Sequence, residues 1–243
     1  MKGSDFAVLL PTHNRQDMFL LFDRAINSCL NNTILPNQIL VVVDGPVHQE
    51  FSEKIKKYES HDLISILWLK SNVGLALALN EGLKLIDTKY VFRADGDDFN
   101  RKNRFQVQLE MLENGYDLVG SAIAEKDMDG KQLAVKRCPL KHSDIVNYAY
   151  RRCPINHMTA AYKTDLVKSV GGYPEIYLKE DWALWTLMIE AGAKIANSDE
   201  ILVDALTDIN MYKRRGGFKN IISEFSMQKF LVKHLSKSIF LAL

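Results

Sequence analysis

The chain has 243 residues, of which 47% are hydrophobic and 25% are charged. This usage is typical of one large α/β domain with a sizeable core, and it argues against a disordered chain. The formal net charge of +1 supplies no global field that would attract nucleic acid, so we expect no nucleic-acid partner.

The cysteines and the apolar runs bear on the cellular compartment. Cys29, Cys138 and Cys153 are widely spaced and form no CxxC pair, which argues against a disulfide framework and against a zinc site. The apolar run Phe6–Leu10 is too short for the core of a signal peptide, and no stretch reaches the ~18 apolar residues of a membrane-spanning helix. We expect a cytosolic protein, with or without a peripheral membrane contact.

The first hundred residues alternate between short apolar runs and apolar stripes at helical spacing. The runs predict strands at Phe6–Leu10, Gln38–Val43, Leu63–Leu69 and Tyr90–Ala94, and the stripes predict helices at Met18–Leu30, Val47–Tyr58 and Gly74–Ile86. This alternation through short connections indicates an α/β fold, with a doubly wound, mostly parallel sheet and helices on both faces.

The second half is less regular. Its patterns predict strands at Asp117–Ile123, Gln132–Arg137 and Asn156–Tyr162, a helix at Glu180–Ala191, and short edge strands at Ala193–Ala196 and Ile201–Leu206.

Residues 211–243 carry seven basic side chains and the single acid Glu224, and from Tyr212 we expect one long amphipathic helix. An apolar stripe accompanied by lysines suits either core packing, which is the commoner outcome, or an anionic membrane surface. We expect Ser238–Leu243 to be the part on lipid. The predicted stripe consists of Phe218, Ile221, Ile222, Phe225, Val232, Leu235 and Ile239.

Polar residues follow each of the four strands predicted in the first half. The carboxyl ends of the strands form the ligand-binding edge of such a sheet, so we expect these residues to meet there. They are Thr12–Arg15, Asp44, Ser71–Asn72 and Asp95–Asp98. No G-x-G-x-x-G motif and no P-loop follows the first strand, which argues against the familiar dinucleotide and phosphate sites.

Three carboxylates within four positions, Asp95, Asp97 and Asp98, are the most informative feature of the chain. Charges this close repel each other and gain nothing from a core. Their proximity becomes favourable when a divalent cation and a phosphate-bearing ligand bind at the end of the strand. An isolated D-x-D is equally compatible with an acidic surface turn, so the surrounding sequence decides.

Short motifs occur in a fixed order along nearly the whole chain. They are Pro11-Thr12-His13-Asn14-Arg15, Val43-Asp44-Gly45-Pro46, Asn72-Val73-Gly74-Leu75 with Ala78-Leu79-Asn80, Asp95-Gly96-Asp97-Asp98 with Arg104-Phe105 and Gln108, Val119-Gly120-Ser121, Asn156-His157, Gly171-Gly172-Tyr173, Glu180-Asp181 with Leu184-Trp185, and Arg214-Arg215-Gly216-Gly217. In this order and spacing they resemble family 2 glycosyltransferases of the GT-A fold, in the bacterial branch that builds O-antigen, capsule and exopolysaccharide repeat units.

The resemblance implies a glycosyltransferase domain at 1–210, with a nucleotide-binding half at 1–100 and an acceptor-binding half at 101–210. A basic helical extension at 211–243 would follow. One departure concerns the acidic motif: Phe92-Arg93-Ala94 stands where this branch usually has an apolar or Arg-Met pair, and Gly96 replaces the usual Ala or Ser.

The resemblance also implies roles on the donor side. Asp97 would ligate Mn²⁺ or Mg²⁺, Asp95 would hold the ribose or a metal-bound water, and Asp98 would support the loop. Asp44 would hydrogen-bond the uracil edge or the ribose. The other residues expected to line the nucleotide pocket are Pro11, Thr12, Asn14, Arg15 and Asn72.

On the acceptor side the resemblance implies a general base, for which Asp181 is the candidate, with Glu180 orienting it or touching the acceptor. Asn156 and His157 would face the acceptor region, and Arg214 and Arg215 would bind a diphosphate. The single base, without a second nucleophilic carboxylate, implies direct displacement with inversion.

The function implied is transfer of a hexose or N-acetylhexosamine from a UDP-sugar to a polyprenyl-diphosphate-linked sugar, on the cytoplasmic face of the inner membrane. Two alternatives stay open. A sugar nucleotidyltransferase also uses a doubly wound sheet and a metal, although it usually has a glycine-rich loop where Pro11–Arg15 has no glycine. A non-catalytic sugar-nucleotide-binding subunit is the other, and the acids Asp97 and Asp181 argue against it.

Overall fold

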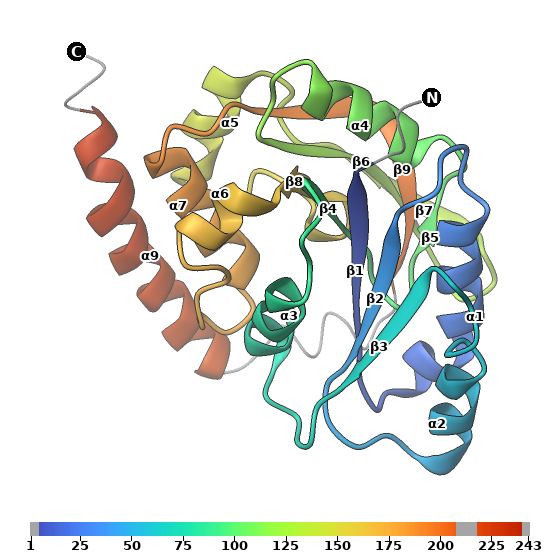
Figure 1. The fold of residues 1–243 in the computed structure, drawn as a ribbon. Helices are drawn as coiled ribbons and strands as arrows, with labels where there is room; N and C mark the ends of the chain where they lie inside the picture. Colours follow the sequence, from blue (N-terminus) through green and yellow to red (C-terminus); the bar gives the residue numbers. More distant parts are fainter. Residues whose placement is uncertain (1–4, 208–217, 240–243) are drawn as a thin grey trace.

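The computed structural model describes residues 5–207 and 218–239 (Figure 1). The described strands form one mixed sheet in the order β3-β2-β1-β4-β8-β6-β9-β5, and β7 pairs with β6. The strands are β1 (Phe6–Thr12), β2 (Gln38–Val43), β3 (Ile64–Trp68), β4 (Tyr90–Arg93), β5 (Phe99–Asn100), β6 (Leu118–Lys126), β7 (Gln132–Lys136), β8 (Ala161–Lys163) and β9 (Ile195–Leu206). The helices are α1 (Gln16–Leu30), α2 (Gln49–Lys56), α3 (Leu75–Lys84), α4 (Arg104–Glu113), α5 (His142–Ala149), α6 (Thr164–Ser169), α7 (Glu180–Glu190) and α9 (Phe218–Ile239), with a 3₁₀ turn, η1, at His157–Thr159.

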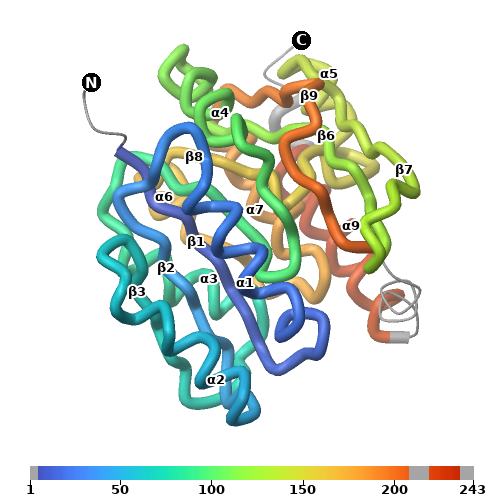
Figure 2. The backbone as a smooth tube through the Cα atoms, turned by 90° about the vertical axis from the view of Figure 1, so that its right-hand side faces the viewer, coloured from blue at the N-terminus to red at the C-terminus, as the bar shows by residue number. Residues whose placement is uncertain are grey.

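The first half is the predicted parallel α/β arrangement. β1 pairs in parallel with β2 and β4, and β2 pairs in parallel with β3. Every residue of β1 is buried, as a continuous apolar run covered on both faces requires. Figure 1 shows α1 and α2 on one side of these strands and α3, α7 and α9 on the other, and Figure 2 gives the view from the α1 side.

Two hydrophobic clusters fill the two faces of the sheet. One joins the sheet to α1, α2 and α4 through side chains such as Phe22, Phe51 and Phe105. The other joins it to α3, α5, α6, α7 and α9, with the fully buried Trp185 among its members. The predicted halves 1–100 and 101–210 share this single sheet, because β4 pairs with β8.

The strand predicted at Asn156–Tyr162 is wrong over most of its length. The Thr159 backbone N–H and its side-chain Oγ1 both donate to the Asn156 carbonyl, at 2.9 and 2.8 Å, and this closes the 3₁₀ turn η1. The strand here is β8, which runs antiparallel to β4 and β6.

The two short edge strands predicted near residue 200 are also wrong, because they are one strand inside the sheet. β9 runs parallel to β6 on one side and antiparallel to β5 on the other. Its register against β6 shifts around Ser121 to Ile123. That irregularity accommodates the polar residues of β9 around Asp199, which break the apolar pattern in the sequence.

The apolar stripe predicted for the C-terminal helix is wrong for most of its described members, although the predicted Leu235 is buried. Met227, Leu231 and Leu235 are the buried side chains and join the α7 side of the core. The predicted members Ile221, Ile222, Phe225 and Val232 are 51–68% exposed. Residues 212–217 of the predicted helix lie outside the described part of the chain, and no described helix is long and apolar enough to cross a bilayer.

The loop between α6 and α7 is attached to α3 through Asn80. Its side chain accepts a hydrogen bond from the Tyr173 N–H at 2.7 Å and donates one to the Tyr173 carbonyl at 2.9 Å. Gly171 and Gly172 precede it, both in the left-handed region with φ of 92° and 76°. A Cβ on Gly172 would collide with Asn80 Oδ1, whereas a Cβ on Gly171 would meet no atom within 4 Å.

These two glycines form a matched pair for a stability test. We expect Gly171→Ala to destabilise the protein by about 1–2 kcal/mol, the cost of left-handed backbone alone. Gly172→Ala should cost at least ~1 kcal/mol more, because the collision also displaces the Asn80 bonds. Urea unfolding of both variants measures the difference, and equal destabilisation would contradict the Asn80 contact.

Candidate active site

The acidic loop after β4 brings three carboxylates to one place. Oxygens of Asp95, Asp97 and Asp98 lie within 4.8 Å of one another. Asp98 is buried, and its Oδ1 accepts the Leu206 N–H at 2.9 Å, which attaches the loop to the end of β9. A Cβ on Gly96 would lie 3.1 Å from Met18 Sδ, so the loop packs closely against α1. A larger residue at this position would require the flexible Met18 side chain to shift slightly.

Crowding changes the ionisation of this loop. Burial, reinforced by the charge of Asp95, raises the pKa of Asp97 to about 7, although the contacting Arg15 guanidinium acts in the opposite direction. Burial and the charge of Asp97 also raise the pKa of Asp98 well above its ordinary value. A bound divalent cation would relieve this repulsion. The donor set consists of carboxylate oxygens only, which fits Mg²⁺ or Mn²⁺, and Asp97 and Asp95 are its more accessible members.

Arg93, the last residue of β4, is a buried cation next to these acids. It is 1% exposed, and its Nη1 lies 2.6 Å from Asp95 Oδ1. Its Nε has no hydrogen-bond partner among the described residues. Sequence reasoning noted Arg93 only as a departure and gave it no role, although an arginine inside an apolar strand was itself a signal.

A second buried arginine fixes the backbone of the same strand. Arg104 Nη2 donates to the Arg93 carbonyl at 2.6 Å, and Arg104 Nε donates to Gln108 Oε1 at 2.9 Å. Gln108 in turn donates to the Thr159 carbonyl at 2.6 Å. This chain of bonds connects the acidic loop to η1 and β8, on the opposite half of the molecule.

Asp44 and Asn72 connect the ends of β2 and β3. The Asp44 carboxylate accepts the N–H groups of Val73 at 2.7 Å and Gly74 at 3.0 Å, at the start of α3. Asn72 Nδ2 donates to the Asp44 carbonyl at 3.0 Å. These bonds make the two loops one rigid unit. A contact of Asp44 with uracil or ribose stays a prediction.

The residues after β1 lie on the same edge of the sheet. Arg15 contacts both Asp17 and Asp97. Asn14 Oδ1 accepts the His48 N–H at 3.2 Å. Thr12 is buried, and its Oγ1 has no hydrogen-bond partner among the described residues. Pro11 and Thr12 both belong to β1 and pair with Val42 and Val43 of β2.

The acid pair Glu180-Asp181 lies at the start of α7. Asp181 Oδ1 accepts the Trp182 N–H at 2.7 Å, and its Oδ2 lies 3.4 Å from the donating Cys153 Sγ. Burial and the charge of Asp181 raise the pKa of Glu180 to about 7, and burial raises the pKa of Asp181. Both carboxyl groups therefore hold a proton more tightly than an exposed carboxyl group does.

His157 lies in an aromatic cluster beside this pair. Its Nε2 lies 3.3 Å from the Tyr173 hydroxyl, which lies 3.1 Å from the Tyr162 hydroxyl. Burial, with Arg93 nearby, lowers the pKa of His157 well below its ordinary value, so the ring is neutral. Asn156 is buried, and its Nδ2 donates to the Ser121 carbonyl at 3.0 Å. A contact of Asn156 with the acceptor stays a prediction.

The acidic loop and the acid pair are close enough to influence each other electrostatically. The charge of Asp95 raises the pKa of Glu180, and the charge of Arg93 lowers it. The structure thus brings together Arg15, Asp95 and Asp97 directly, with the acid pair within electrostatic reach. Sequence reasoning missed Cys153 and Tyr173 as neighbours of the pair, although Tyr173 belongs to the Gly171-Gly172-Tyr173 motif. Arg214 and Arg215, predicted to bind diphosphate, lie outside the described residues.

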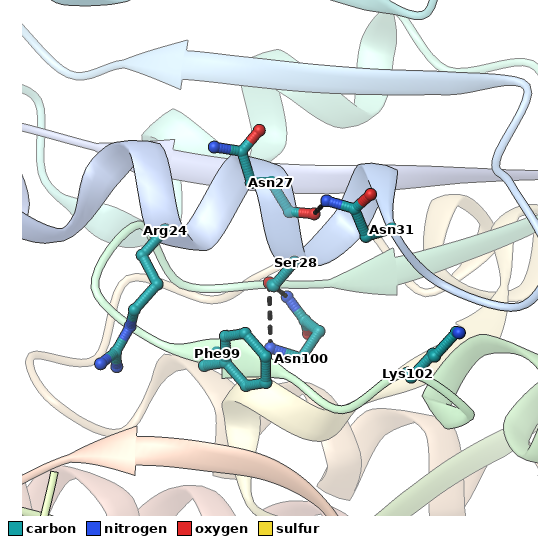
Figure 3. Close-up of a pocket in the computed structure, with 7 residues that line it drawn as sticks. All are labelled: Arg24, Asn27, Ser28, Asn31, Phe99, Asn100 and Lys102. Carbon is teal, nitrogen blue, oxygen red and sulfur yellow. Dashed lines mark hydrogen bonds between the residues drawn. The ribbon is translucent and has the colours of Figure 1, made fainter.

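A separate depression of about 450 Å³ lies between α1 and β5 (Figure 3). The buried polar groups on its floor bond to each other, since Asn100 Nδ2 donates to Ser28 Oγ at 2.9 Å. None of the predicted site residues lines it. The lining residues are Arg24, Asn27, Ser28, Asn31, Phe99, Asn100 and Lys102.

This sheet, with an acidic loop after β4 and an acid pair on the adjacent half, defines a glycosyltransferase of the GT-A fold. The family model described as Glycosyl transferase family 2 matches residues 7–170. The chain belongs to this family, and the predicted membership is confirmed.

Two relatives are similar over most of the chain. An *Escherichia coli* protein named UDP-Gal:alpha-D-GlcNAc-diphosphoundecaprenol beta-1,3-galactosyltransferase is 34% identical over 226 residues, which is 92% of this chain and 82% of that protein. The amylovoran biosynthesis glycosyltransferase AmsE of Erwinia amylovora is 30% identical over 226 residues, covering 92% and 84%.

Two solved structures share the fold at low sequence identity. *S. aureus* TarS 1-349 in complex with UDP-GlcNAc has a TM-score of 0.70 at 20% identity, covering 88% of this chain and 62% of that one. The mannosyltransferase PcManGT from Pyrobaculum calidifontis, in complex with GDP-Man and Mn²⁺, has a TM-score of 0.68 at 17% identity, covering 97% and 64%. This chain therefore spans less than two thirds of either chain, and the likeness confirms the predicted fold.

The ionisation of Asp97 predicts how pH and metal affect stability. Its pKa is about 7 in the folded protein, against 3.8 for an unperturbed aspartate, so the folded state binds the proton more tightly. The contribution of Asp97 to stability therefore becomes more favourable as pH falls from about 8 to about 5. Asp97→Asn should stabilise the metal-free protein at about pH 8 by on the order of 2 kcal/mol, and much less at about pH 5.

Mn²⁺ should raise the melting temperature of the wild type at about pH 8 and should raise that of Asp97→Asn far less. Thermal melts at both pH values, with Mn²⁺ or with EDTA, measure these differences. Asp129→Asn, an exposed aspartate in the turn after β6, is the control. Equal Mn²⁺ shifts in wild type and Asp97→Asn would contradict the assigned ligand.

Proposed function

We propose that this glycosyltransferase transfers a hexose or N-acetylhexosamine from a UDP-sugar to a polyprenyl-diphosphate-linked sugar, in the synthesis of a bacterial surface polysaccharide. The reaction would take place on the cytoplasmic face of the inner membrane. The observation that carries the proposal is that two acidic groups, the loop at Asp97 and the pair at Asp181, lie close enough to interact electrostatically. The name of the *E. coli* relative makes UDP-galactose and a GlcNAc-diphosphate lipid the first substrates to try.

On the donor side, breaking the sugar–oxygen bond leaves a negative charge on the diphosphate of UDP. Mn²⁺ or Mg²⁺ bound by Asp97 and Asp95 would stabilise that charge. Arg15 contacts Asp97 and supplies a further positive group next to the phosphates. Arg93 holds Asp95 in place from the protein interior. The uracil and ribose would lie near Asp44, where two loops form a rigid unit.

On the acceptor side, Asp181 would remove the proton from the attacking hydroxyl group. Its Oδ1 is held by the Trp182 N–H, which fixes the carboxylate at the start of α7. Glu180, whose pKa burial and the charge of Asp181 raise to about 7, would orient Asp181 or contact the acceptor. A single general base, with no covalent sugar–enzyme intermediate, would give direct displacement with inversion at the anomeric carbon.

Two tests separate this function from the alternatives. Purified protein is incubated with UDP-sugars and a synthetic GlcNAc-diphosphate lipid, and the products are analysed by mass spectrometry. A disaccharide lipid with release of UDP supports transfer, and full activity in EDTA would remove the metal role. Pyrophosphate release from a sugar phosphate and UTP would instead indicate a nucleotidyltransferase, and UDP binding without turnover a non-catalytic subunit.

The role of Asp181 predicts a selective loss. Asp181→Asn should lower kcat by about 10²–10⁴, the usual contribution of a general base, with little change in UDP affinity. Asp144→Asn is the matched control, because Asp144 is also an aspartate in the first turn of a helix. Steady-state kinetics and UDP titration measure both effects. Normal turnover of a folded Asp181→Asn protein would exclude this residue as the base.

A further inference from the structure

α9 has two opposite faces built with the same spacing. Ser223, Met227, Leu231 and Leu235 recur every four residues and are all buried. A second ridge, at residues 221, 225, 229 and 233, has the same spacing, and all four residues are exposed. Each of its members lies two positions from a member of the buried ridge. Two positions correspond to about 200° of rotation, so these ridges lie on opposite sides of the helix.

The buried ridge is firmly attached to the domain. His234 Nδ1 lies 2.6 Å from Glu190 Oε2, and the Tyr150 hydroxyl donates to the Leu235 carbonyl at 2.9 Å. The buried ridge packs against α7 and its neighbours, so the exposed ridge cannot occupy the same core position while α9 is packed in this way. In the described part of the chain, the opposite ridge of α9 therefore faces outward.

The composition of the outward face is unusual for a solvated helix. Ile221, Ile222 and Phe225 are 53%, 51% and 68% exposed, and together they form an apolar patch toward the start of α9. The exposed described residues of α9 include three lysines and no acid. They are Lys219, Ile221, Ile222, Phe225, Ser226, Gln228, Lys229, Val232 and Lys233. The helix's only acid, Glu224, pairs with Lys179 of the domain at 2.5 Å.

An apolar patch flanked by lysines, whose one neighbouring acid, Glu224, is paired with Lys179, matches the surface of an anionic bilayer. The apolar side chains enter the boundary between headgroups and acyl chains, and the lysines remain with the negative headgroups. A second copy of this chain would bring the same lysines together and would repel. The charge pattern therefore favours lipid over self-association.

The position of this face relative to the acid pair matters for the reaction. Ser223 of α9 donates to the Tyr177 carbonyl, and Glu224 pairs with Lys179, so α9 supports the loop that leads directly into Glu180-Asp181. Figure 1 shows the start of α9 at the same lower edge as the carboxyl ends of β1 and β2. A bilayer on this face would lie beside the acceptor half of the site.

We propose that the outward face of α9, with Ile221, Ile222 and Phe225 as apolar contacts and Lys219, Lys229 and Lys233 as charge contacts, binds the surface of an anionic bilayer. This assignment rests on the proposed function, because a lipid-linked acceptor is presented at such a surface. It names the described helix face. Of the segment Ser238–Leu243, which the sequence predicts on lipid, residues 240–243 lie outside the described part of the chain.

Vesicle sedimentation tests the proposal with the full chain. The wild type should bind vesicles of phosphatidylethanolamine with phosphatidylglycerol, and bind phosphatidylcholine vesicles much less. The variant Ile221→Ser, Ile222→Ser, Phe225→Ser should partition at least about tenfold more weakly. The control variant Leu20→Ser, Leu85→Ser, Leu133→Ser removes apolar side chains of 50%, 52% and 53% exposure elsewhere and should bind as the wild type does.

Changing the three lysines to glutamine should remove the preference for anionic vesicles and its salt dependence. Unchanged partitioning of the apolar variant, or no wild-type binding, would overturn the proposal. So would a wild-type dimer in sedimentation velocity that the apolar variant converts to a monomer. UDP binding and transfer to a water-soluble, short-chain acceptor should stay normal in the apolar variant. Absence of UDP binding and of sugar transfer in the wild type would instead refute the proposed function, independently of lipid binding.

Discussion

The candidate site depends on one buried ion pair, Arg93 with Asp95. A guanidinium that is 1% exposed is stable only when charge and hydrogen bonds compensate its lost hydration, and Asp95 supplies that charge at 2.6 Å. Arg104 fixes the Arg93 carbonyl and, through Gln108, connects the strand to η1. The positive charge of Arg93 also reaches Glu180 and His157 on the other half. The two halves of the site are therefore organised around two interior cations, Arg93 and the Arg104 that holds its backbone.

This arrangement explains how crowded acids persist in a folded protein. Asp97 and Asp98 have raised pKa values, so the acidic loop is destabilising by itself near neutral pH. Arg15 and Arg93 offset part of that repulsion from two sides. The remainder is available to a cation, which is the property a donor site for a nucleotide sugar requires. The crowded acids lower the stability of the folded protein near neutral pH, and a bound cation would restore it.

The sequence predicted those parts of the fold whose signals are local. β1 to β4 lie in apolar runs ended by turn residues, which predict strands. The acids after β4 indicate a binding site because core packing does not explain them. β8 and η1 escaped prediction because the Thr159–Asn156 bonds close a turn within an apolar stretch. The course of β9 depends on its partners β6 and β5. The roles of Arg93 and Cys153, and the phase of α9, depend on tertiary contacts that no spacing in the chain encodes.

The most direct test of this account is UDP binding, with Mn²⁺, to Arg93→Met and Arg93→Lys by isothermal titration calorimetry. Thermal melts of both variants check that they are folded. Arg93→Met leaves Asp95 without its partner, so we expect UDP affinity to fall at least about tenfold, with partial retention in Arg93→Lys. A folded Arg93→Met protein with wild-type affinity would contradict the central role of the buried cation.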